Sequence, residues 1–251
     1  MSELPDTPRR VAVINDTSAY VGPHLARSLA LKRHDLVLGD ASPDLVAELT
    51  ALGAKVVAVT DARDSTKPEA SARLVDAAMT TFGRIDSATA ATGRVVTGRF
   101  LKSTIEDLHA VTKGCIDAPY HFLRAVIPVM VEQKDGQALL ITSAAGARPT
   151  PGAPLYSAAR AAATMLARNV AVEVARHGVQ VNVLGTNFMD FPEFLRANGV
   201  IDAESRAKVE AQVPLGRLGT LEEFAAFCMP FVDGSSRFTT GQFVAYAGGW
   251  V

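Results

Sequence analysis

Short runs of consecutive apolar residues alternate along this chain with longer segments in which apolar residues recur every three or four positions. The short runs are typical of strands buried on both faces, and the longer segments are typical of helices with one buried face. The predicted strands cover residues 11–14, 35–38, 55–59, 85–91, 137–141, 179–184 and 242–246. Helices are predicted at about residues 23–32, 104–133, 156–176 and 221–231, with two more that begin near residue 42 and end before residue 83.

This alternation predicts the fold class. A strand–helix repeat with buried strands indicates an α/β protein with a Rossmann-like, doubly wound parallel sheet of about seven strands in a three-layer αβα arrangement. No repeat, low-complexity stretch or linker interrupts the pattern, so residues 1–251 are predicted to form a single domain. Ligands of such sheets bind outside the carboxyl ends of the strands, and the candidate chemistry is expected there.

Composition narrows the function classes. The chain has 251 residues, of which 48% are hydrophobic and 20% charged, and its formal net charge is −1. This charge balance argues against a nucleic-acid partner, and no apolar stretch is long enough to cross a bilayer. The polar N-terminal segment, broken by proline, does not read as a signal peptide, which favours a cytoplasmic location. Cys115 and Cys228 lie in apolar helical patterns without the spacing of metal ligands, so no metal is expected.

One group of side chains predicts acid–base chemistry. Tyr156 and Arg160 are four residues apart in a predicted helix, so they lie on one face, and a cation so close to a phenol favours the phenolate. Ser143 follows the strand at residues 137–141, where its hydroxyl can reach the same bound oxygen as the phenol. A lone pair of this kind is more often a surface tyrosine beside an arginine. Tyr120 and Arg124 have the same spacing but no serine-bearing strand before them.

The turn after the first strand predicts that no dinucleotide cofactor binds. Nucleotide-binding sheets need glycines there, so that the backbone can approach the pyrophosphate. In this chain only Gly22 remains, and Tyr20 stands where a glycine would admit phosphates. The carboxylate of Asp16 adds a negative charge, which would repel a pyrophosphate. Asp40, after the second strand, has the position of a ribose-binding carboxylate, although such an aspartate more often caps the following turn.

These motifs resemble the short-chain dehydrogenase/reductase superfamily and, within it, the halohydrin dehalogenases. The resemblance covers the chain from Val11 to Gly249. The Ser-x12-Tyr-x3-Lys pattern of the dehydrogenases occurs with arginine in the last place, and the aromatic turn at Tyr20 is similar to that of the dehalogenases. Other superfamily motifs on the cofactor side are replaced: the Asn-Asn-Ala-Gly motif by residues 90–93, and the Pro-Gly after the sixth strand by residues 186–187. The catalytic asparagine of the long helix is missing from residues 100–136.

The resemblance implies cofactor-independent dehalogenation of vicinal haloalcohols to epoxides. Ser143 would hold the substrate hydroxyl, Tyr156 would remove its proton, and Arg160 would keep the tyrosine ionised. The alkoxide would then expel the halide. The reverse reaction would open epoxides with azide, cyanide or nitrite.

The resemblance also implies a binding pocket and an assembly. The halide would lie in a loop whose backbone N–H groups belong to Phe188 and Met189, shaped by Thr186 and Asn187, while Tyr20 and Phe194 would line the substrate pocket. The alternative for this loop is a hydrophobic flap that packs on the sheet. The helices at residues 104–133 and 156–176 would form the interface of a homotetramer.

Two alternatives remain at this stage. The first is an NAD(P)(H)-dependent short-chain carbonyl reductase with degenerate cofactor motifs, which binding of a nicotinamide dinucleotide would support. The second is a non-catalytic binding protein on the same scaffold, which would need neither Ser143 nor Tyr156.

Overall fold

A single seven-stranded sheet forms the centre of the molecule. The computed structural model describes residues 9–250. All strand pairs are parallel, in the order β3-β2-β1-β4-β5-β6-β7. The strands are β1 (Arg10–Ile14), β2 (His34–Gly39), β3 (Val56–Val59), β4 (Ser87–Ala91), β5 (Gly136–Ser143), β6 (Val179–Thr186) and β7 (Phe243–Tyr246). The predicted fold class is therefore confirmed.

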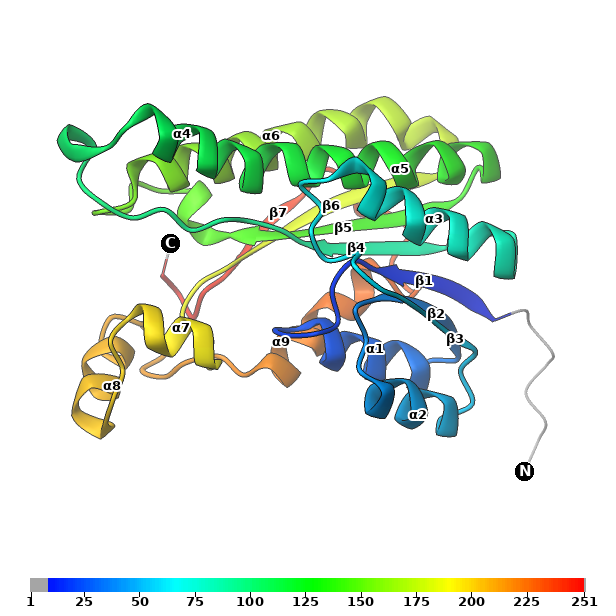
Figure 1. Ribbon diagram of the computed structural model, residues 1–251, viewed down its shortest axis with the longest axis horizontal. Coiled ribbons are helices and arrows are strands. Elements are labelled where there is room, and N and C mark those ends of the chain that lie inside the picture. Colours follow the sequence, from blue (N-terminus) through cyan, green and yellow to red (C-terminus); the bar gives the residue numbers. More distant parts are fainter. Residues whose placement is uncertain (1–8, 251) are drawn as a thin grey trace.

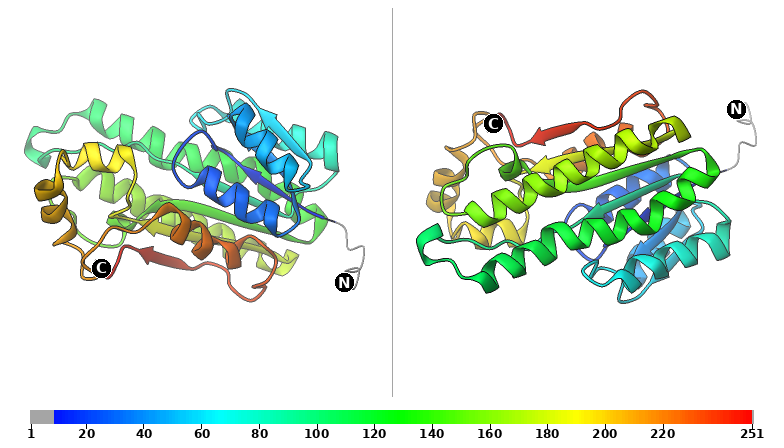
Figure 2. Two further views of the ribbon diagram at one scale, coloured as in Figure 1. Left: turned by 90° about the horizontal axis from the view of Figure 1, so that it is seen from below. Right: turned by 90° about the horizontal axis from the view of Figure 1, so that it is seen from above.

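Helices cover both faces of the sheet, as Figures 1 and 2 show. They are α1 (Gly22–Leu31), α2 (Pro43–Ala51), α3 (Pro68–Phe82), α4 (Ile105–Thr112), α5 (Ala118–Gln133), α6 (Pro154–Val174), α7 (Pro192–Ala197), α8 (Ala203–Glu210) and α9 (Leu221–Cys228). Helices α3 to α6 lie above the sheet in Figure 1, and α1, α2 and α9 lie below it. Helices α7 and α8 extend from the lower layer beside the carboxyl ends of the strands. No described helix has the length and apolarity needed to span a membrane.

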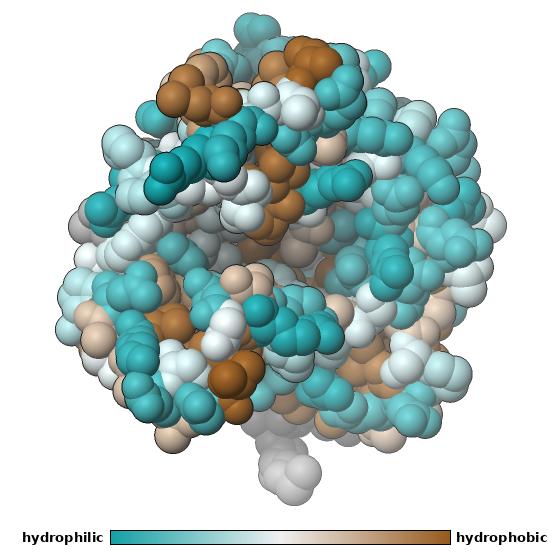
Figure 3. All heavy atoms as spheres, turned by 60° about the vertical axis from the view of Figure 1, so that its left-hand side comes forward, coloured by the Kyte–Doolittle hydropathy of each residue, from teal (hydrophilic) through white to brown (hydrophobic). Residues whose placement is uncertain are grey.

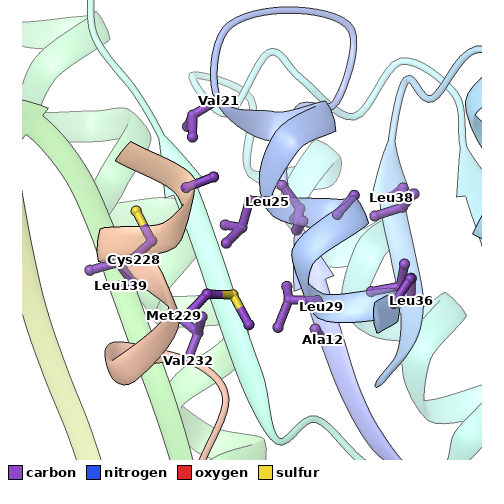
Figure 4. Close-up of a cluster of buried hydrophobic side chains, with 14 of the residues drawn as sticks. Ala12, Val21, Leu25, Leu29, Leu36, Leu38, Leu139, Cys228, Met229 and Val232 are labelled. Carbon is purple, nitrogen blue, oxygen red and sulfur yellow. The ribbon is translucent and has the colours of Figure 1, made fainter. Parts of the chain in front are cut away.

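The central strands bury both faces, which explains their unbroken apolar runs. On β5, Leu139 and Ile141 contact the core under α1 and α9, while Ala138 and Leu140 contact the core under α5 and α6. Figure 4 shows part of the first core, where Leu139 lies beside Cys228 of α9. Both cysteines are buried free thiols, as the sequence predicts.

The structure departs from the predicted elements around the site. Strands β5 and β6 run two residues beyond their apolar runs, and their last residues, Ser143 and Thr186, pair with each other. The stretch after β6, predicted as irregular, contains α7 and α8. The sequence did not predict these helices because their mostly exposed residues show no apolar periodicity.

The predicted helix at residues 104–133 also differs. A π-helical turn at Lys113–Asp117 separates α4 from α5. Gly114 sits in this turn against the backbone of Arg94, where a Cβ atom would come within 2.8 Å of the Arg94 nitrogen. Only a glycine permits this approach of the loop after β4 to the helix.

Candidate active site

Ser143 ends β5 at the carboxyl edge of the sheet. Its side chain is buried, and its Oγ accepts a hydrogen bond from the Ala145 N–H at 3.2 Å. The hydroxyl also donates to the carbonyl oxygen of Thr186 on the neighbouring strand, at a long 3.4 Å. The strand ladder and the short turn after it therefore fix the position of the serine.

Tyr156 and Arg160 lie in the first turns of α6. The Arg160 Cζ is 5.0 Å from the centre of the Tyr156 ring, so the cation is placed on the face of the phenol. Arg160 is only 6% exposed. Its Nε and Nη1 have no hydrogen-bond partner among residues 9–250. The buried guanidinium therefore has the Tyr156 ring as a direct neighbour on which its charge can act.

Gly93 shapes the space for the Arg160 guanidinium. This glycine has a φ of +142°, and a Cβ added to it would lie 1.8 Å from the Arg160 Nη2. The guanidinium is thus held between the Tyr156 ring and the backbone after β4. Within residues 90–93, the glycine that the altered motif retains therefore makes room for the arginine.

The second Tyr-x3-Arg pair has no such setting. Tyr120 is 46% exposed on α5 and packs edge-on against His121, with the ring centres 5.5 Å apart. Tyr120 is a surface residue, as predicted for a Tyr-x3-Arg pair without a serine-bearing strand before it.

Tyr20 joins the turn after β1 to the end of β6. Its backbone is in the left-handed region, with φ at +54°, and its hydroxyl donates to the Thr186 Oγ1 at 2.8 Å. Its ring packs against Phe191 at 4.7 Å between centres. Burial raises the pKa of Tyr20, whereas the bond to Thr186 opposes the rise, and the charges of Tyr156 and Arg160 act on it as well. Tyr20 is therefore an electrostatic neighbour of the catalytic candidates.

The turn after β1 holds Tyr20 where a dinucleotide site is expected to have a glycine. The Tyr20 hydroxyl bonds to Thr186, the last residue of β6, and so joins this turn to that strand end. The Asp40 carboxylate accepts hydrogen bonds from the backbone N–H groups of residues 61, 62 and 63, so it organises a loop rather than offering itself to a ribose. Asp40 therefore does not cap the turn that follows it, contrary to the alternative interpretation, because Ser42 is the N-cap of α2; Asp40 holds the loop after β3 instead.

The loop predicted to cradle a halide has its own internal bonds. The N–H of Phe188 donates to the Asn187 Oδ1 at 2.9 Å, and the N–H of Asn187 donates to the Tyr246 carbonyl at 3.3 Å. The Phe188 N–H, one of the two expected to hold the anion, is therefore already bonded. Phe188 itself is buried, and Phe194 packs on it at 5.9 Å between ring centres, which is closer to the flap alternative.

The molecule is hollowed at this end. Figure 3 turns the ends of the strands and the loop before α4 forward, and a recess is visible between the upper and lower layers. Sequence reasoning missed two residues of this region: Arg148, in the loop after Ser143, and Trp250, whose ring lies 4.4 Å below the Arg148 Cζ. Their separation along the chain hides the contact, and the only available signal was that Trp250 is the single tryptophan.

Comparison with known proteins defines the class. Residues 17–251 match the family model described as enoyl-(acyl carrier protein) reductase. A 3-oxoacyl-(acyl-carrier-protein) reductase of Synechocystis is 30% identical over 96% of this chain and 97% of its own length. A 2,5-dichloro-2,5-cyclohexadiene-1,4-diol dehydrogenase of Sphingobium indicum is 25% identical over 96% of both chains. The structure of levodione reductase superposes with a TM-score of 0.85 at 24% identity, covering 96% of each chain.

The fold and the sequence similarity are thus those of a short-chain dehydrogenase/reductase. The chain belongs to the enoyl-(acyl carrier protein) reductase family of that superfamily.

These comparisons overturn the expected activity. The predicted cofactor-independent halohydrin dehalogenase, a lyase, disagrees with relatives that are named reductases and dehydrogenases. They favour the alternative, a short-chain carbonyl reductase whose cofactor motifs are altered. The prediction failed because the altered turn at Tyr20 and the arginine at 160 were taken to decide the reaction, whereas the rest of the chain aligns with oxidoreductases.

Proposed function

We propose that this protein is an oxidoreductase that interconverts a carbonyl group and a hydroxyl group of a small organic substrate. Ser143, Tyr156 and Arg160 are its proposed catalytic residues. The observation that carries the proposal is the buried Arg160 guanidinium stacked on the Tyr156 ring in a chain whose relatives are reductases and dehydrogenases.

The proposed roles follow from the positions of these side chains. In the reductive direction, the Ser143 hydroxyl donates a hydrogen bond to the substrate carbonyl, and the Tyr156 hydroxyl donates the proton to the developing alkoxide. The Arg160 cation stabilises the phenolate that remains. In the oxidative direction the phenolate takes the proton back. A positioned acid of this kind contributes about 10²–10⁴-fold to the rate.

Arginine suits this role better than a group that titrates. A guanidinium stays charged at all pH values of interest and does not accept the proton in place of the tyrosine. Arg160→Lys is therefore expected to shift the pH–rate profile while leaving a cation under the ring. An unchanged profile would remove Arg160 from the proposed chemistry.

The hydride of such a reaction comes, in this superfamily, from a nicotinamide dinucleotide. Because Tyr20 crosses the edge of the sheet, the proposal requires that its hydroxyl leave Thr186 and its ring move before a dinucleotide enters. Thr186 and Asn187, at the end of β6, and Phe194 then form the wall of the substrate pocket together with Tyr20.

The test is consumption of reduced nucleotide in the presence of small ketones. Wild-type protein would be incubated with NADH or NADPH and a panel of ketones, and alcohol formation would be measured. Tyr156→Phe is expected to lose about 10²–10⁴-fold in kcat. Tyr120→Phe removes the same hydroxyl from the other Tyr-x3-Arg pair and serves as the matched control. Alcohol formation that survives in Tyr156→Phe, or that fails with every ketone and both nucleotides, would contradict the proposal.

A further inference from the structure

A continuous series of ring contacts begins in the loop that follows Ser143. The Arg148 Cζ lies 4.4 Å from the centre of the Trp250 ring, and the Trp250 ring is 5.6 Å from that of Phe188. Phe188 then contacts Phe194 at 5.9 Å. The contacts therefore lead from the serine-bearing loop to the C-terminal segment and on to the segment after β6.

The series returns to its starting point on the other side. Phe194 lies 6.3 Å from Phe191, and Phe191 lies 4.7 Å from Tyr20. Tyr20 donates to Thr186, whose carbonyl accepts from Ser143. Arg148 is only five positions after Ser143 (148 − 143). The contacts thus form a closed circuit at the carboxyl edge of the sheet.

The two halves of this circuit belong to different parts of the molecule. Phe188 belongs to a small core with Val209, Val213 and Leu218, and Phe194 and Trp250 pack against it. This core is separate from the two large cores, which lie on opposite faces of the sheet. The C-terminal segment is attached to this small core, because the N–H of Leu215 donates to the carbonyl of Gly248. Arg148, in contrast, lies in the loop that joins β5 to α6. The Arg148–Trp250 contact therefore bridges the small core and the catalytic loop.

We propose that Arg148, Trp250, Phe188, Phe194 and Phe191 form the rim of the substrate opening, and that the Arg148–Trp250 contact is its closing link. In this position the two residues act as positioning residues that set how large an apolar substituent reaches Ser143 and Tyr156. This rim belongs to the site of the proposed function, and its assignment rests on that function only for the identity of the substrate. When the Arg148–Trp250 contact is present, the rim is closed; when it is broken, the rim is open. A cation–π contact of this kind is expected to shift the ratio of closed to open molecules by about 2- to 30-fold.

Trp250 supplies its own reporter, because it is the single tryptophan of the chain. Fluorescence quenching of Trp250 by acrylamide, measured without any substrate, reports how well the rim covers the ring. Arg148→Gln is expected to raise the quenching constant, and Arg148→Lys, which keeps a cation over the ring, to restore most of the protection. Arg176→Gln removes an exposed positive charge elsewhere and is the matched control. Equal quenching in the wild type and Arg148→Gln would overturn the inference.

Kinetics with a small and a bulky ketone give the second readout. Arg148→Gln and Trp250→Leu are each expected to change KM by about 2- to 30-fold, more for the bulky ketone, with little change in kcat. The double variant is expected to change KM by less than the two single changes combined, because both act on the same contact. Additive effects, or equal changes for both ketones, would contradict the link. If no ketone is reduced but the quenching results hold, the proposed function fails while the rim stands.

Discussion

At the scale of single residues, the site depends on how Arg160 is held. Its guanidinium has a phenol ring on one side and the Gly93 backbone beside it, and it lacks a carboxylate partner among the described residues. A cation in this setting would be costly if its only role were packing. A role for the Arg160 cation beyond packing is therefore expected, and the ring that it contacts is that of Tyr156.

Gly93→Ala tests this arrangement. The new methyl group would overlap the guanidinium, so Arg160 must leave the Tyr156 ring, and activity is expected to fall at least about tenfold. Gly98→Ala is a close control, because Gly98 has nearly the same φ, +146° against +142°, with open space around its Cβ position. Both variants would carry a similar backbone strain. Equal losses of activity in the two would show that strain, and not the position of Arg160, explains the effect.

At the scale of elements, Tyr20 connects two segments of the proposed nucleotide site. It ties the turn before α1 to the last residue of β6, and its left-handed backbone costs about 1 kcal/mol in a residue other than glycine. One side chain and one hydrogen bond therefore join the turn after β1 to the end of β6.

Removal of that side chain is expected to open the edge. Tyr20→Gly should bind NADH or NADPH at least about tenfold more tightly than the wild type, as measured by titration calorimetry. Tyr20→Phe keeps the ring and loses only the hydroxyl, so its affinity should lie between the two. Equal affinities in all three proteins would show that Tyr20 does not guard the edge.

The opposite edge of the sheet contains a buried histidine with consequences for stability. His34, the first residue of β2, is 2% exposed, and its Nε2 has no hydrogen-bond partner in the described chain. Burial lowers the pKa of His34 below its ordinary 6.5, and the Arg10 charge lowers it further. The folded protein therefore holds His34 neutral.

This predicts a loss of stability in mild acid. As the pH falls below about 6.5, the unfolded chain takes up a proton that the folded protein resists, so the free energy of unfolding falls until the folded pKa is passed. Above that range the effect is absent. His34→Gln should flatten the decline in denaturant titrations, whereas His177→Gln should not. A decline that is unchanged in His34→Gln would assign it to other groups.

The sequence predicted the buried strands and the shared helix face, but it did not predict the exposed helices or the contacts between distant residues. The unbroken apolar runs of β1, β2 and β5 predicted strands because those strands are buried on both faces. The Tyr156–Arg160 spacing predicted one helix face, and the structure places the guanidinium on the ring because both side chains belong to one helix start. The α7–α8 segment and the Arg148–Trp250 contact were not predictable, since exposed helices lack periodicity and distant contacts leave no local pattern.

At the scale of the whole molecule, assembly remains a prediction. Helices α5 and α6 leave an apolar groove between them, lined by residues that include Leu123, Ile127, Leu166 and Val170. A homotetramer built through these helices should appear as such in light scattering, and Val170→Glu should shift it to smaller species. A monomeric wild-type protein would contradict the prediction.

The central claim, that Ser143 and Tyr156 serve carbonyl–hydroxyl interconversion, has one decisive measurement. A chlorinated vicinal alcohol would be incubated with the wild type and Tyr156→Phe, with and without NAD⁺ or NADP⁺, and its products identified. The wild type is expected to form a chloroketone that retains its chlorine, together with one equivalent of reduced nucleotide and one proton. This product should form only in the wild type and only when the nucleotide is present. Formation of an epoxide and free chloride without nucleotide would contradict it.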